Sequence, residues 1–150
     1  IGHFFEDLKP GDTFHSGPVT FTEAELVDFS KRFDPQPVHT DPHSEEARKF
    51  GGVIACGAHI LAASFRLHVT SGIFGEAFVV GLGLESVRWP APVKGGDTIR
   101  AEVAVTEMRR SASKPGHGIV KSELRAYNQR DELVMTMISV ELIKCRDAAA

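Results

Sequence analysis

The chain has 150 residues, of which 42% are apolar, and this is enough to build one domain with a packed core. Its formal net charge of −3 excludes the strongly basic balance that is usual in nucleic-acid-binding domains. The sequence has neither a signal-peptide pattern nor an apolar run of about 18 residues, so we expect a cytoplasmic protein without a membrane span. Cys56 and Cys145 lack the spacing of a metal site or of a disulfide framework.

The first third of the chain predicts short helices joined by turns. Residues 11–19 are rich in turn-forming types, and a short strand is expected at residues 19–21. Thr22 opens a capping box, and apolar residues with helical spacing follow it, which predicts a helix over residues 23–33. A second short helix is expected from about Asp41, with Asp41 as its N-cap.

The remainder predicts one long helix and four strands. Residues 54–69 are almost wholly apolar or small, which predicts a helix that is buried on nearly every side. Alternating apolar residues then predict strands at 78–89, 97–108, 118–128 and 133–143. No linker divides the chain, so we expect residues 1–150 to form a single α+β domain, in which a curved antiparallel sheet wraps around the long helix.

The segment Asp34-Pro-Gln-Pro-Val-His39 places a carboxylate and an imidazole five residues apart. Each proline disfavours helix for the residue before it, so Asp34 and Gln36 are expected in extended or turn geometry. Histidine exchanges protons readily near neutral pH, and a neighbouring carboxylate can orient the same water molecule. The segment therefore predicts that Asp34 and His39 together activate water, and it leaves open which of them takes the proton.

Residues 34–41, Asp-Pro-Gln-Pro-Val-His-Thr-Asp, resemble the hydratase motif of MaoC-like dehydratases and (R)-specific enoyl-CoA hydratases, which commonly reads Asp-x-Asn-Pro-hydrophobic-His-x-Asp. Residues 50–57, Phe-Gly-Gly-Val-Ile-Ala-Cys-Gly, resemble the entry into the central helix of that family, and residues 95–98 resemble the turn before its third major strand. The likeness covers nearly the whole chain. It implies a hotdog fold, which is usually paired as a dimer.

The resemblance also implies a reaction, the reversible addition of water to a trans-2-enoyl-CoA thioester. Asp34 and His39 would be the catalytic pair of this enoyl-CoA hydratase or 3-hydroxyacyl-CoA dehydratase. Gly57 matches the glycine whose backbone N–H faces the thioester oxygen. We therefore expect an acyl-CoA substrate and a homodimer, with no metal and no cofactor apart from the coenzyme A of the substrate.

Three positions depart from the family pattern. Gln36 stands where many hydratases have asparagine, and Cys56 replaces a histidine that often precedes the helix glycine. Some bacterial hydratases carry a serine eight residues after that glycine, where this chain has Phe65 with Ser64 beside it. These changes leave the type of reaction standing and leave the acyl group, its length and the physiological direction open.

Simpler roles compete for the same residues. Asp34 could only end a helix, His39 could only be a surface loop residue, and Gly57 could serve packing alone. His39 and His43 are four residues apart, but Pro42 interrupts a common helix and no third metal ligand presents itself. Roles in packing are favoured for the two histidines of the long helix, His59 and His68. For the three cations Arg109, Arg110 and Lys114, a solvated turn is favoured over contacts with coenzyme A.

Two other functions remain open. A hotdog thioesterase often carries a catalytic carboxylate on the central helix, as do carrier-protein dehydratases, and residues 54–69 contain no acidic residue. A non-catalytic acyl-CoA binding module would not need the Asp34 and His39 pair to be intact.

Overall fold

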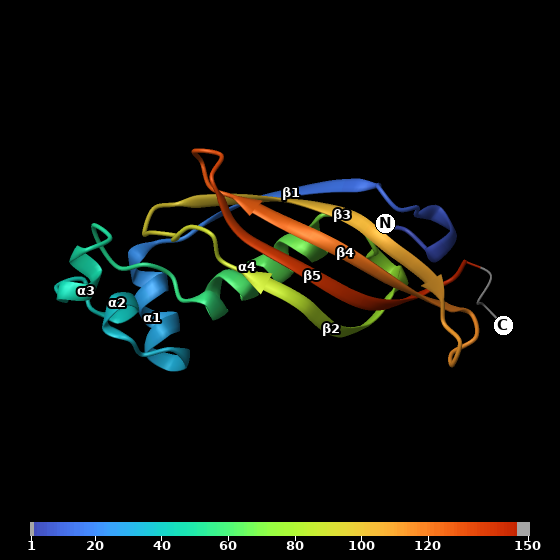
Figure 1. Cartoon of the computed structure of the whole chain (residues 1–150), viewed down its shortest axis with the longest axis horizontal. Helices are drawn as coiled ribbons and strands as arrows, with labels where there is room; N and C mark the ends of the chain where they lie inside the picture. Colours follow the sequence, from blue (N-terminus) through green and yellow to red (C-terminus); the bar gives the residue numbers. More distant parts are fainter. Residues whose placement is uncertain (1, 147–150) are drawn as a thin grey trace.

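The computed structural model describes residues 2–146, and these form a five-stranded antiparallel sheet that curls around one long helix (Figure 1). The order of strands across the sheet is β1-β3-β4-β5-β2. The strands are β1 (Thr13–Thr20), β2 (Phe78–Arg88), β3 (Thr98–Arg110), β4 (His117–Tyr127) and β5 (Leu133–Lys144). The helices are α1 (Glu23–Phe33), α2 (Pro37–Thr40), α3 (Glu45–Arg48) and α4 (Gly57–Thr70), with short 3-10 turns η1 (Phe5–Asp7) and η2 (Gly75–Ala77). This is the expected hotdog arrangement.

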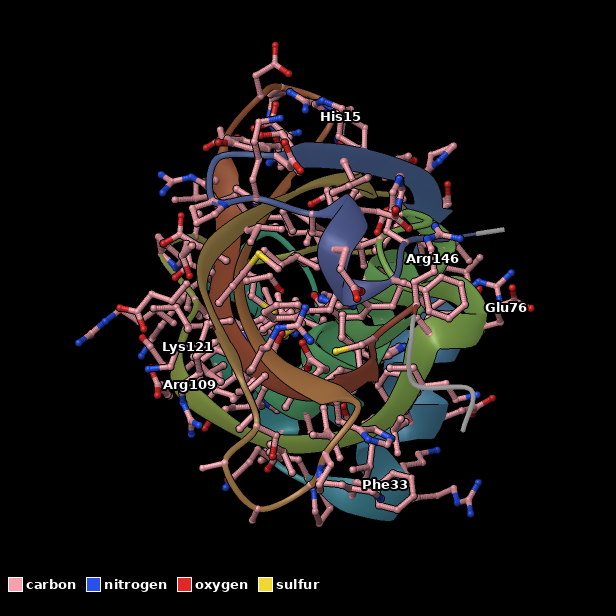
Figure 2. All side chains as sticks on the ribbon, turned by 90° about the vertical axis from the view of Figure 1, so that its right-hand side faces the viewer. His15, Phe33, Glu76, Arg109, Lys121 and Arg146 are labelled. Carbon is pink, nitrogen blue, oxygen red and sulfur yellow. The ribbon has the colours of Figure 1, made fainter. Side chains whose placement is uncertain are left out.

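The four long strands lie where the sequence predicts them, with bounds within two residues of those predicted. On β3, for example, Ile99, Ala101, Val103 and Val105 are buried and face the core. Figure 2 looks along the sheet and shows α4 inside the curl, whereas Arg109 and Lys121 project from the outer face. One face of the sheet thus packs on α4 and the other carries charge.

The expected short strand at residues 19–21 is wrong in its extent. β1 begins at Thr13 and pairs with β3 on both sides of a register shift between Ser16 and Val19. Gly17 and Pro18 fall within that shift, where a proline costs the ladder no hydrogen bond. A bulge in an edge strand therefore has the composition of a turn.

Helix α1 has the predicted bounds because its cap forms as the sequence indicates. The hydroxyl of Thr22 accepts a hydrogen bond from the backbone N–H of Glu25 at 3.1 Å. Leu26 faces the core and is fully buried. After Phe33 the chain leaves the helix, and the N–H of Asp34 donates to the carbonyl oxygen of Ser30 at 2.8 Å.

The prediction that Asp41 caps the next helix is wrong. Helix α3 begins at Glu45, and its N-cap is Ser44, whose hydroxyl accepts from the N–H of Ala47 at 3.1 Å. Asp41 instead accepts from the N–H of His43 at 2.9 Å, which closes a turn between two helices. The sequence offers two capping residues three positions apart, and the acidic residues that follow Ser44 decide between them.

Helix α4 is buried on one side only. Ile60, Ser64 and Leu67 face the sheet and have almost no exposed surface. On the other side, Phe65 is 46% exposed and Val69 is 73% exposed. The expectation of burial on nearly every side is therefore wrong for a single chain, because apolar composition does not reveal whether a face is covered by the same chain or by another.

The short helices gather at one end of the sheet. Figure 1 shows α1, α2 and α3 beside the start of α4, while η1 and the β3–β4 hairpin lie at the opposite end. The end with the short helices therefore holds all three residues that the sequence proposes for a site. Within residues 2–146, no helix is both long and apolar enough to cross a membrane.

Candidate active site

Asp34 and His39 are brought together by the two prolines between them. Asp34 and Gln36 both leave helical geometry, with ψ values of 72° and 139°, as the sequence predicts for residues that precede proline. Pro37 then starts the single turn of α2, since a proline is tolerated at the first position of a helix. His39 lies on this turn, so its ring comes back towards the end of α1.

The two side chains face each other at a distance that is too long for a direct hydrogen bond. Nε2 of His39 lies 3.6 Å from Oδ2 of Asp34. The imidazole is largely buried, whereas 37% of the carboxylate side chain is exposed. An acid and a base therefore converge at the surface of the molecule, and solvent or a ligand can reach them.

The other ring nitrogen of His39 is held by the backbone. Nδ1 lies 2.8 Å from the carbonyl oxygen of Ile54, and a carbonyl oxygen can only accept a hydrogen bond. In the neutral imidazole the proton is therefore assigned to Nδ1, which leaves the lone pair on Nε2, towards Asp34. Ile54 is itself fixed, because its N–H donates to the carbonyl oxygen of Val38 at 3.1 Å.

Gly57 lies three residues beyond this anchor and is the first residue of α4. Cys56, the N-cap, is buried and makes no side-chain capping bond. The N–H groups of a first helical turn lack partners within the helix, and they carry its positive dipole end. The segment that orients His39 thus leads directly to a set of backbone donors.

The sequence did not single out Trp89, which packs on Gly57. A Cβ atom at Gly57 would lie 2.6 Å from the indole Cζ2, so a side chain there would collide with the ring. The packing role that competes for Gly57 therefore has a definite partner. The hydrogen bond from Ala55 N–H to the carbonyl oxygen of Val93, at 2.8 Å, joins the two segments. Sequence patterns carry no signal for this contact, because it depends on chain closure over some thirty residues.

The two histidines of α4 lie in packed environments. The ring of His59 stacks on Phe29 with centroids 4.3 Å apart and meets Phe21 edge-on. Burial lowers the pKa of His59. His68 lies deep against the sheet, three turns from Gly57. Among residues 2–146, no group of three histidine, cysteine, aspartate or glutamate side chains is arranged to hold a metal ion.

The cations near the β3–β4 hairpin lie far from this pair in the same chain. Arg109 points away from the sheet on its outer face (Figure 2), and the hairpin lies at the end opposite to α1 and α2 (Figure 1). Arg110 is engaged by Glu6, with Nη2 and Oε2 3.6 Å apart, and lies over the ring of Phe5. The contacts of Arg110 thus lie at the far end of the domain.

Comparisons with known proteins agree with the fold. The model of the MaoC-like domain family matches residues 7–128. The crystal structure of the MaoC-like dehydratase from Rhodospirillum rubrum is similar, with 36% identity and a TM-score of 0.87 over 97% of this chain and 99% of that one. An (R)-hydratase from A. caviae involved in PHA biosynthesis is 26% identical with a TM-score of 0.70, over 91% of this chain and 97% of that one.

A curated relative is longer than this chain. The mesaconyl-CoA hydratase of Cereibacter sphaeroides is 31% identical over 157 residues, which cover 99% of this chain and 43% of the relative. This chain therefore spans less than half the length of that enzyme. Since the family model matches most of the chain and the fold agrees throughout, the chain belongs to the MaoC-like domain family.

Proposed function

We propose that the chain catalyses the reversible addition of water to a trans-2-enoyl-CoA thioester, with Asp34 and His39 sharing the reacting water molecule. The observation that carries the proposal is the contact between Nδ1 of His39 and the carbonyl oxygen of Ile54. It directs the Nε2 lone pair towards Asp34, and the 3.6 Å separation suits a bridging water better than a direct bond.

In this mechanism, one O–H of the water donates to Nε2 of His39 and the other donates to Oδ2 of Asp34. His39 takes the first proton while the water oxygen bonds to the β-carbon, and the electron pair of the double bond moves towards the thioester oxygen. The imidazolium then returns the proton to the α-carbon, so both side chains regain their starting states. Acid–base assistance of this kind contributes about 10²–10⁴-fold to a rate.

Gly57 is proposed to stabilise the enolate. The thioester oxygen gains negative charge as water adds, and the N–H of Gly57 at the start of α4 is a donor with the helix dipole behind it. Removing one donor from comparable oxyanion sites costs roughly 2.7–4 kcal/mol. The reaction needs no metal or redox group, and coenzyme A enters only as part of the substrate.

The family and the names of its relatives support the type of reaction. The domain family is MaoC-like, and similar proteins include a mesaconyl-CoA hydratase and an (R)-hydratase. Only the first of these names specifies an acyl group. In this chain, Gln36, Cys56 and Phe65 depart from the common pattern. The proposal is therefore limited to enoyl-CoA thioesters as a class.

The test uses a panel of straight, branched and carboxylated enoyl-CoA thioesters. Turnover is measured as the loss of their conjugated absorbance. We expect turnover of at least one member by the folded protein. Release of free coenzyme A would instead indicate a thioesterase, against which stands the absence of any carboxylate on α4. Calorimetric binding of the whole panel without turnover would leave an acyl-CoA binding module.

We also propose that a second copy of the chain pairs with the edge of β2. This edge strand carries the exposed apolar side chains Phe78, Val80, Leu82 and Leu84. On the exposed face of α4, Phe65 and Val69 are also apolar, and Val69 lines one hollow with Phe78. The opposite edge strand, β1, is interrupted by its bulge and by Pro18, which lacks an N–H to donate. A second β2 would satisfy free backbone groups and cover apolar surface at once.

A further inference from the structure

The indole of Trp89 lies directly against the first residue of α4. A Cβ atom at Gly57 would lie 2.6 Å from Cζ2, 2.8 Å from Cε2 and 3.0 Å from Cη2 of the ring. Gly57 is α-helical, and its φ is not in the left-handed region, so the backbone alone does not require glycine there. The ring is the reason that a side chain is excluded.

The loop that carries Trp89 is firmly held. Val93 is fully buried, and its carbonyl oxygen accepts from the N–H of Ala55 at 2.8 Å. The N–H of Lys94 donates to Oδ2 of Asp97 at 2.9 Å, and Lys94 forms a backbone bridge with Ile54. The loop is therefore joined to the same residue, Ile54, whose carbonyl oxygen orients His39.

Trp89 keeps part of its ring open to solvent. Although it packs on Gly57, 47% of its surface is exposed. Core packing alone would bury a residue of this size more completely, because a large ring contributes to stability in proportion to the apolar area it buries. A fixed aromatic surface beside the N-terminus of α4 is therefore available to a ligand.

We propose that Trp89 is a positioning residue for the acyl thioester, and this inference rests on the proposed function. An oxygen bonded to the N–H of Gly57 lies about 3 Å from that nitrogen. The indole covers the side of Gly57 where a Cβ would stand, and in the proposed arrangement the conjugated group attached to that oxygen packs against the exposed part of the ring. The ring then limits sideways movement of the double bond relative to Asp34 and His39.

Two substitutions of Trp89 separate the need for an aromatic ring from the need for tryptophan itself. Trp89→Ala removes the wall, and we expect kcat/KM for the best enoyl-CoA to fall about 10- to 100-fold, with kcat falling as well, since small misplacements of a substrate are costly. Trp89→Phe keeps an aromatic surface and is expected to restore most of the activity. Wild-type kcat and KM in Trp89→Ala would overturn the inference.

Tyr127→Ala is the control. Tyr127 lies on β4, where the guanidinium carbon of Arg100 is 4.8 Å from its ring centroid, so this variant loses a partly exposed aromatic ring from the sheet. Thermal unfolding and light scattering of both variants exclude a loss of fold or of oligomeric state. If Tyr127→Ala loses as much kcat as Trp89→Ala, the effect is a general result of losing an aromatic ring and the proposed role is wrong.

A binding experiment keeps this inference distinct from the proposed reaction. Trp89 is the single tryptophan of the chain, so its fluorescence reports on one place. Titration with butyryl-CoA, which has no double bond to hydrate, is expected to change the emission with the same midpoint that calorimetry gives for binding. Constant emission despite calorimetric binding overturns the role of Trp89 alone. No binding and no turnover of any thioester overturns the proposed function, and this inference with it.

Discussion

Nε2 of His68 lies 3.8 Å from Oε1 of Glu141, and two serines complete a closed ring of polar contacts between α4 and the sheet. Nε2 is 3.0 Å from the hydroxyl of Ser122, which is 3.2 Å from that of Ser139, and Ser139 donates to Oε1 of Glu141 at 3.1 Å. Burial raises the pKa of Glu141 to about 7 and lowers the pKa of His68 to about 4. Between these values both groups are neutral, so the pair is not a salt bridge.

The raised pKa of Glu141 predicts a stability that falls as pH rises from the ordinary carboxyl pKa of 4.5 through about 7. A carboxyl whose pKa is higher in the folded state stabilises the fold below its ordinary pKa, and this contribution is lost as pH rises through about 7. Glu141→Gln stays neutral and keeps an oxygen that can accept from Ser139. The difference in unfolding free energy between this variant and the wild type should therefore rise by on the order of 2–3 kcal/mol, in favour of the variant, from mildly acidic to mildly alkaline pH.

Urea unfolding across that pH range measures the change. Glu76→Gln, which removes an exposed carboxylate, is the control (Figure 2), and its difference from the wild type should stay flat. A flat profile for Glu141→Gln as well would contradict the burial argument. His68 has the opposite sign: its contribution is present above its ordinary pKa and is lost as pH falls through about 4.

Removal of either member of the proposed catalytic pair should abolish most of the hydration. We expect His39→Ala and Asp34→Asn each to lower kcat by about 10²–10⁴-fold, because the first removes the base that takes the proton and the second replaces the carboxylate by a neutral amide. His43→Ala removes an exposed imidazole four residues away and should retain wild-type activity. Fixed-time assays of product formation with the best enoyl-CoA check this prediction. Full activity in His39→Ala would exclude the proposed mechanism.

Local patterns predicted those parts of the fold that local forces decide. The bounds of α1 follow from the Thr22 cap and from helical spacing, and the alternation along β3 predicted its buried face. The convergence of Asp34 with His39 follows from the two prolines between them, which leave the chain few conformations.

Features that depend on distant segments were not predictable in this way. The bond between His39 and Ile54 joins residues fifteen positions apart, and the contact between Gly57 and Trp89 crosses a still longer stretch. In β1, Gly17 and Pro18 have the composition of a turn because a bulge tolerates the same residues. Asp41 lost the capping role to Ser44, since either residue type can cap a helix.

Ser64 should matter for stability and little for catalysis. It is fully buried on the inner face of α4, where its hydroxyl donates to the carbonyl oxygen of Ile60 at 2.8 Å and contacts the sulfur of Met135 at 3.1 Å. Ser64→Ala removes these bonds. The carbonyl oxygen of Ile60 is still left with its partner inside the helix. We expect a loss of about 1 kcal/mol in unfolding free energy and a kcat close to that of the wild type. A large fall in kcat with an unchanged melting temperature would instead place Ser64 in the reaction.

Val69 tests the proposed pairing of two chains. It is 73% exposed on α4 and lines one hollow with Phe78 at the start of β2, and a second copy would cover it. Val69→Asp puts a charge into that contact, and burying an unpaired charge is strongly unfavourable. We expect light scattering to give twice the 16.3 kDa chain mass for the wild type and the single-chain mass for this variant. His15→Asp adds the same charge at the exposed surface of β1, the opposite edge (Figure 2), and should leave the mass doubled. A doubled mass that survives Val69→Asp but is lost in His15→Asp would move the interface to β1.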